Sequence, residues 1–153
     1  MKYEEIILDD FSIVGISVRT WNKDGKGVAD IQKLWTDFMS NNVADDINNR
    51  LSDEIYCVYT DYESDKDGAY TVILGYKVSD TNDVTGEYDY KDIPGGKYFK
   101  FVGEGKIPEC VGKTWAYIWN SNIERRYLAD FEVYGKEAMD PENAKVVTYL
   151  SVE

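Results

Sequence analysis

The sequence predicts one α+β domain, in which two βαββ half-repeats form an antiparallel sheet with two main helices on one face and a groove between the halves. A strand–helix–hairpin pattern occurs twice, over residues 11–78 and 97–152. The two helical segments also align with each other, IQKLWTDFM over VGKTWAYIW. A chain of 153 residues can bury one hydrophobic core but is short for two. We therefore treat residues 1–153 as a single domain.

The first half begins with a strand at residues 11–21, which are rich in β-branched and aromatic side chains. Apolar residues then recur three and four positions apart from Val28 to Met39, which predicts one buried face of a helix. Two further β-rich runs, at 55–62 and 69–78, are separated by the polar, glycine-containing segment ESDKDG. Such a pair predicts a hairpin.

The second half repeats this order. A strand at about 97–103 follows the turn-forming sequence IPGG, and an apolar stripe predicts a helix near 108–122. Strands at 128–135 and 144–152 then form a second hairpin. Neither half can bury its helix and its strand edges alone. We therefore expect the halves to join edge to edge into an antiparallel sheet of eight strands, or nearly so.

The repeat can be followed into the strands. IYCVY (55–59) aligns with DFEVY (130–134), and ILGYK (73–77) aligns with VVTYL (146–150). The helices align so that Trp35 matches Trp115, and we expect both to be largely buried between helix and sheet. The seam between pseudo-symmetric halves is a common place for a ligand.

Composition excludes several functions. The 17 basic and 29 acidic residues give a net charge of −12, which disfavours direct binding to nucleic acid or to a membrane. No histidine is present, so histidine-based triads and histidine-ligated metals are excluded. There is no phosphate-binding glycine motif, and DKDG at 65–68 fits a hairpin tip better than a calcium loop. We expect no cofactor and no metal.

The sequence also suggests where the protein resides. We expect no signal peptide, because the first ten residues are acidic, and no apolar run is long enough to span a membrane. Cys57 and Cys110 lie in apolar stretches without a CxxC spacing, which is typical of reduced core cysteines. These features predict a cytoplasmic protein.

One charged residue, Glu132, stands in the otherwise apolar strand FEVY. Strand alternation places Glu132 and Tyr134 on the same face, and the repeat aligns Glu132 with Cys57. Glu132 could face solvent on a half-exposed sheet. It could also lie at the base of an aromatic groove, where it would meet a cationic ligand. The side chains that we expect to bind a ligand are Glu132, Trp119, Tyr134, Tyr59 and Tyr149.

These segments resemble a known family. IYCVYTDYESDKDGAYTVILGYKV, IPGGKYFKF, TWAYIW and YLADFEVYG are similar to the integron-associated effector-binding proteins, and the resemblance covers residues 11–152. This family belongs to the gyrase-inhibitor-like superfamily of small-molecule-binding domains, which also occur in multidrug-sensing transcription activators. The resemblance implies that residues 1–153 form one effector-binding-like domain that binds hydrophobic, often cationic compounds, with the acidic residue of the DFEVY strand, here Glu132, at the base of the groove.

The resemblance supports binding more than regulation, because the sequence shows no DNA-binding segment and a regulatory role would need a protein partner. We therefore expect a stand-alone binding module for hydrophobic, cationic organic molecules rather than an enzyme. One alternative is a hydrolase of strained small-ring electrophiles, with Glu132 as general base and a nearby tyrosine as acid. Another is an acidic, gyrase-inhibitor-like module that mimics nucleic acid toward a basic protein. Product formation would identify the first alternative, and salt-sensitive capture of a partner would identify the second.

Overall fold

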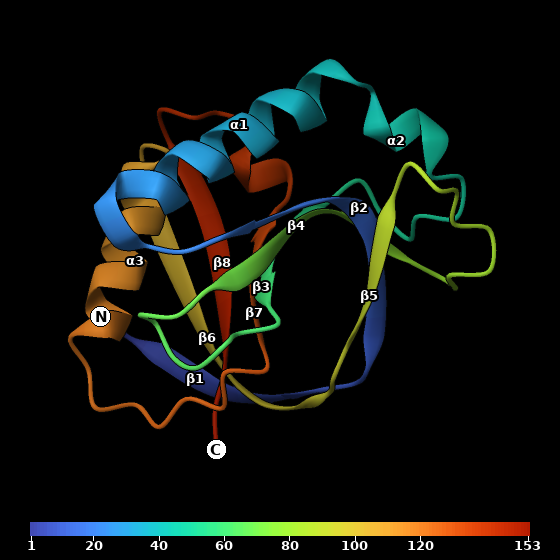
Figure 1. Ribbon diagram of the computed structural model, residues 1–153. Coiled ribbons are helices and arrows are strands. Elements are labelled where there is room, and N and C mark those ends of the chain that lie inside the picture. The colour runs from blue at the N-terminus through green and yellow to red at the C-terminus, as the bar shows by residue number, and fades with distance from the viewer.

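A computed structural model describes all 153 residues and consists of one eight-stranded antiparallel sheet with helices on one face (Figure 1). The strand order is β1-β6-β8-β7-β3-β4-β2-β5. The strands are β1 (Tyr3–Leu8), β2 (Phe11–Thr20), β3 (Ile55–Thr60), β4 (Tyr70–Val78), β5 (Asp89–Ile93), β6 (Gly96–Gly105), β7 (Ala129–Tyr134) and β8 (Ala144–Ser151). The helices are α1 (Lys26–Ser40), the short α2 (Val43–Asp46) and α3 (Glu109–Trp119). The predicted fold class is confirmed.

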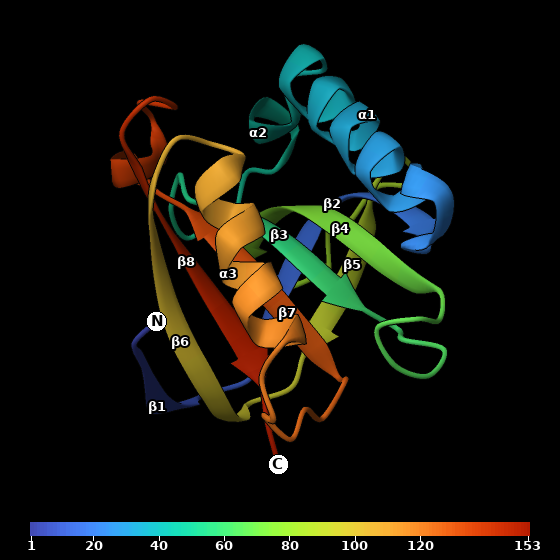
Figure 2. The same ribbon diagram turned by 90° about the vertical axis from the view of Figure 1, so that its left-hand side faces the viewer.

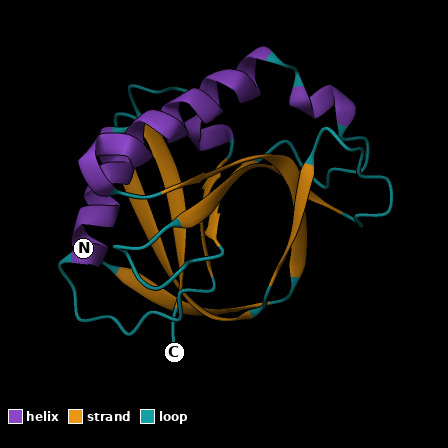
Figure 3. Cartoon of the chain, in the orientation of Figure 1, coloured by secondary structure: helices purple, strands orange, loops and turns teal.

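The helices α1 and α3 cover the same face of the sheet, one over each half (Figure 2). Leu34 and Phe38 of α1 pack into a core of residues from the first half. Ile118 of α3 packs with Phe101 and Leu150 of the second half. The sheet curls so that its other side is concave (Figure 3). A third apolar cluster lies on this concave side and includes Ile13, Tyr56, Val58, Tyr98 and Phe131.

The two halves exchange strands, which the sequence did not predict. The strands β1 and β5 precede β2 and β6 in the chain, but β1 pairs with β6 and β5 pairs with β2. Each half is therefore ββαββ, and its first strand lies at the sheet edge of the other half. The predicted halves, 11–78 and 97–152, do not include these two strands.

The two halves meet where β3 pairs with β7, and there the repeat becomes a pseudo-twofold axis. Cys57 and Glu132, which the sequence aligns, are direct cross-strand partners. A pair of equivalent residues can face each other in this way only where the axis passes between them. The helices follow the same symmetry, since residues 31–40 and 111–120 show the same order of buried and exposed positions.

The outer strands show that one part of the sequence alignment was wrong by a single residue. Cys57 pairs with Leu74 on β4, and Glu132 pairs with Thr148 on β8. Leu74 is therefore equivalent to Thr148, whereas the predicted alignment matched it to Val147. Because strand side chains alternate between faces, this shift turns Tyr149 to the opposite face from the one that the alignment implied.

The pairing of β2 with β4 depends on two glycines that face each other, Gly15 and Gly75. A Cβ atom on Gly75 would lie 2.0 Å from the backbone oxygen of Val14. We expect Gly75→Ala to lower the free energy of unfolding by about 1–3 kcal/mol, the usual cost of overpacking. Gly86→Ala is the control, because nothing lies within 4 Å of a Cβ there. Urea unfolding measures both, and equal stability of the two variants would contradict this close approach.

Candidate functional site

The centre of β7 carries the buried carboxylate that the sequence singled out. The side chain of Glu132 is 1% exposed. It faces the helix-covered side of the sheet, beside Cys57 of β3. No lysine or arginine nitrogen lies within 4.0 Å of it. Glu132 is therefore a buried acidic group without a basic partner, which is costly unless other groups compensate its charge.

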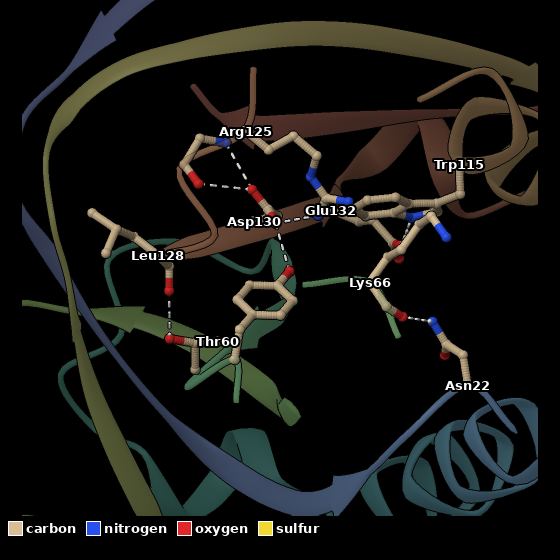
Figure 4. Close-up of polar contacts among 10 residues, drawn as sticks. Asn22, Thr60, Lys66, Trp115, Arg125, Leu128, Asp130 and Glu132 are labelled. Carbon is tan, nitrogen blue, oxygen red and sulfur yellow. Dashed lines mark hydrogen bonds and ion pairs between the residues drawn. The ribbon is translucent and has the colours of Figure 1, made fainter. Parts of the chain in front are cut away.

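Three aromatic side chains supply hydrogen bonds to this carboxylate. The hydroxyl of Tyr59 and the indole Nε1 of Trp115 both donate to Oε2, each at 2.7 Å. The hydroxyl of Tyr134 donates to Oε1 at 2.5 Å. These donors come from β3, α3 and β7, so the site draws on both halves. Figure 4 shows the Trp115 indole directed at Glu132.

The pKa of Glu132 reflects two opposed effects. Burial raises the pKa above its usual value of 4.5, and the hydrogen bonds from Tyr134, Trp115 and Tyr59 lower it, with burial the larger effect. Burial also raises the pKa values of Tyr59 and Tyr134 well above 10, so both phenols remain protonated donors. The site thus holds one buried carboxyl group entirely with neutral donors.

A second carboxylate on the same strand provides an internal comparison. Asp130 lies two residues before Glu132 and is 0% exposed. It forms an ion pair with Arg125 at 2.9 Å and accepts hydrogen bonds from Tyr62 and Ser151. The Arg125 guanidinium lies against the Trp115 ring, 5.8 Å from its centroid, yet it pairs with Asp130 rather than with Glu132 (Figure 4). The fold therefore provides a cation for one buried carboxylate and none for the other.

The aromatic layer over Glu132 follows the pseudo-twofold axis. Trp115 meets Tyr59 edge-on with ring centroids 5.3 Å apart, and its counterpart Trp35 meets Tyr134 edge-on at 4.8 Å. All four side chains are partly buried, and Trp35 and Trp115 pack against the core clusters of their own halves, where helix meets sheet. Because the carboxylate beneath is closed off while these rings are partly exposed, the rings form a thin layer between Glu132 and solvent.

The structure brings together three of the five predicted site residues. Tyr59 and Tyr134 contact Glu132 directly. Trp119 is 47% exposed and lies 6.3 Å from Trp115 between ring centroids, so it borders the aromatic layer from outside. Tyr149 does not belong to this site. It stacks on Phe131 on the opposite face of the sheet, as the one-residue error in alignment requires.

Trp115 is the site residue that the sequence analysis missed. It was assigned to the core, and Trp119 was preferred for the groove. On α3 the two residues lie one turn apart, and only Trp115 directs its indole nitrogen at Glu132. The ion pair of Arg125 with Asp130 was not predicted either. A buried aspartate in the DFEVY segment two positions from Glu132 was the available signal for a second polar site.

No group of three cysteine, aspartate or glutamate side chains is placed to hold a metal ion. Both cysteines, Cys57 and Cys110, are free and buried, as predicted. None of the helices is both long enough and apolar enough to cross a bilayer.

Replacement of Glu132 by glutamine should reveal the cost of burying its charge. Because the folded-state pKa is raised above 4.5, this group favours folding most below that pH. Its contribution is lost as pH rises through the folded-state pKa. We therefore expect the stability of Glu132→Gln, relative to the unaltered protein, to increase from about pH 4 to pH 7.

Denaturant unfolding at several pH values measures this difference. Glu109→Gln, which removes a charge from an exposed position, is the matched control. A difference between Glu132→Gln and the unaltered protein that stays constant with pH would mean that burial does not perturb the titration of Glu132.

Comparison with known proteins agrees with this architecture. Residues 6–152 match the family model described as integron-associated effector binding protein. The YobU protein of Bacillus subtilis (strain 168), whose name proposes a role as transcriptional regulator, is 28% identical over 151 residues, which cover 95% of this chain and 94% of YobU.

Two solved structures are similar over nearly the whole chain. The integron cassette protein VCH_CASS2, from the mobile metagenome of Vibrio cholerae, is 30% identical with a TM-score of 0.79 and covers 99% of this chain and 95% of its own. SAV2435, solved bound to tetraphenylphosphonium, is 18% identical with a TM-score of 0.82, and the match covers 100% of this chain and 94% of SAV2435. On the family match, this chain belongs to the integron-associated effector binding proteins.

Proposed function

We propose that this protein binds hydrophobic organic cations between its two halves, with Glu132 as the group that recognises the positive charge. The observation that carries the proposal is a carboxylate that is 1% exposed, has no basic partner and is surrounded by aromatic rings. A delocalised organic cation is inexpensive to desolvate and is attracted by aromatic faces. Such a ligand would supply the positive charge that the fold supplies to Asp130 but not to Glu132.

Binding requires the aromatic layer to open, because the carboxylate has almost no exposed surface. The rings of Tyr59, Trp115 and Tyr134 are each half-buried, so part of every ring already faces solvent. Rotation of one ring would expose the carboxylate and leave the other rings as walls for the ligand. Trp119, outside this layer, would extend the apolar wall.

The hydrogen bonds at Glu132 are suited to holding a charged carboxylate for a ligand. Each of the three donors stabilises the charged form, although burial has the larger effect and raises the pKa overall. A hydrolase of small-ring electrophiles would need Glu132 or a water bound to it to act as base. The same donors suit a carboxylate that stays charged and attracts a cation.

Two comparisons support the proposal. SAV2435, which shares the fold, was solved with tetraphenylphosphonium, a hydrophobic cation. YobU carries a name that links this family to transcription. We therefore propose that binding of the cation serves as a signal for regulation of transcription, transmitted through another protein.

Isothermal titration calorimetry with tetraphenylphosphonium tests the site. Glu132→Gln keeps the shape of the side chain and removes its charge, so we expect the Kd to rise about tenfold or more, as for loss of a charged contact. Glu109→Gln removes an equal charge from an exposed position and should leave the Kd nearly unchanged. A neutral compound of similar shape, triphenylphosphine oxide, should bind both variants alike. Equal affinity of tetraphenylphosphonium for Glu132→Gln and the unaltered protein would refute the proposed role.

A further inference from the structure

One cavity of the protein lies away from Glu132. It has a volume of about 990 Å³ and opens on the concave side of the sheet, between β5 and the segments that precede β7 and follow β3. Its apolar walls include Phe11, Ile93, Pro94 and Leu128. The volume is at the upper end of the range for small-molecule sites. Glu132 faces the helices, so the two regions are separated by the sheet.

The acidic groups that line this cavity are already engaged by the protein. Asp61 forms an ion pair with Lys91 at 2.6 Å. Asp92 accepts a hydrogen bond from the Ser12 hydroxyl at 2.6 Å. Asp10 likewise accepts one from the backbone N–H of Gly95. Only Asp61 is thus paired with a cation. Asp10 and Asp92 keep their charges, but both are exposed to solvent, where their charges are screened.

One basic group in the lining has no such partner. Lys77 of β4 lines the cavity, is half-buried and forms no ion pair, although the protein has 29 acidic residues. Its ammonium group lies 5.1 Å from the centroid of the Phe11 ring. Tyr76 and Val78 on either side of it pack toward the helices, so strand alternation directs Lys77 to the concave side.

The repeat shows that the scaffold does not need a charge at this position. The strand register makes Leu74 of β4 equivalent to Thr148 of β8. Lys77 lies three residues after Leu74, and Ser151 lies three residues after Thr148, so Lys77 is equivalent to Ser151. Ser151 is neutral, 0% exposed and hydrogen-bonded to Asp130. The halves thus differ by a charge at Lys77 on the concave side, as they do at Glu132 on the helix side.

We propose that this cavity is a second binding site, which takes small amphipathic anions: an apolar body between Phe11, Ile93 and Leu128, and a carboxylate paired with Lys77. The net charge of −12 repels anions at a distance, but salt screens that repulsion beyond about 8 Å at physiological ionic strength. The direct contact with Lys77 and the burial of the apolar body then decide the affinity. The site is independent of Glu132 and of the cation proposed to bind there.

Decanoate is a suitable probe, and decyltrimethylammonium is its counterpart with the same chain and the opposite charge. We expect decanoate to bind saturably by calorimetry and to shift backbone amide resonances of residues around the cavity, such as Ile93 and Leu128. Lys77→Gln should raise its Kd about tenfold, and Lys77→Arg should keep it within a few-fold. Glu132→Gln should bind decanoate as the unaltered protein does. Decyltrimethylammonium should not shift the resonances around the cavity.

Three results would overturn the proposal: no saturable binding of decanoate to the unaltered protein, equal affinity for Lys77→Gln, or resonance shifts at the Glu132 site instead of the cavity. If Lys77→Gln does not fold, the comparison of the two probes on the unaltered protein decides. Equal shifts around the cavity from both probes would then reject a role for charge. If decanoate does not bind, the proposal for the cavity is wrong, but the proposal that Glu132 binds cations is still tested independently by tetraphenylphosphonium.

Discussion

The structure depends on the antiparallel pairing of β3 with β7. These are the two central strands of the sheet, and their hydrogen bonds join the first half to the second. This pairing places Cys57 opposite Glu132 on a pseudo-twofold axis. The helices then lie on either side of that axis, and Tyr59 and Tyr134 approach the same carboxylate from opposite halves. The exchange of β1 and β5 reinforces the joint, since each half also contributes an edge strand to the other.

At the pairing of β3 with β7 the backbone is symmetric, but the two equivalent side chains, Cys57 and Glu132, differ. A symmetric scaffold could carry two thiols or two carboxylates on the axis, and this chain carries one of each. Each hydrogen bond to a charged group is worth about 1.5–3 kcal/mol, and three of them offset much of the cost of burying Glu132. They do not neutralise its charge. Asp130 lies on the same strand and is paired with Arg125, so the fold does place a basic group beside a buried carboxylate of β7.

The sequence predicted the two-fold repetition, the helices and six of the strands, because apolar periodicity is strong in all of them. It missed β1 and β5, which are short edge strands. The strand β1, YEEIIL, contains two glutamates and is mostly exposed. The strand β5, DYKDI, has three charged residues in five. Edge strands carry such charges because they are paired on one side only, and the charges hide the pattern of a buried strand.

The site was predicted at Glu132 because a charge stood in an apolar strand whose repeat counterpart is Cys57. Its neighbours were harder to predict. The alignment of β4 with β8 depended on one shared tyrosine, and a shift of one residue placed Tyr149 on the wrong face. Trp115 and Trp119 lie on the same stripe of α3, and sequence spacing alone does not show which indole nitrogen meets a partner on β7.

The most direct test of the central claim follows the ionisation of Glu132 itself. NMR titration of its side-chain carboxyl carbon reports the pKa in the free protein and with tetraphenylphosphonium bound. Our account predicts a pKa above 4.5 in the free protein, and a lower pKa in the complex, because a bound cation stabilises the charged carboxylate. An identical pKa with and without the cation would show that the ligand's charge does not meet Glu132, and would contradict the account.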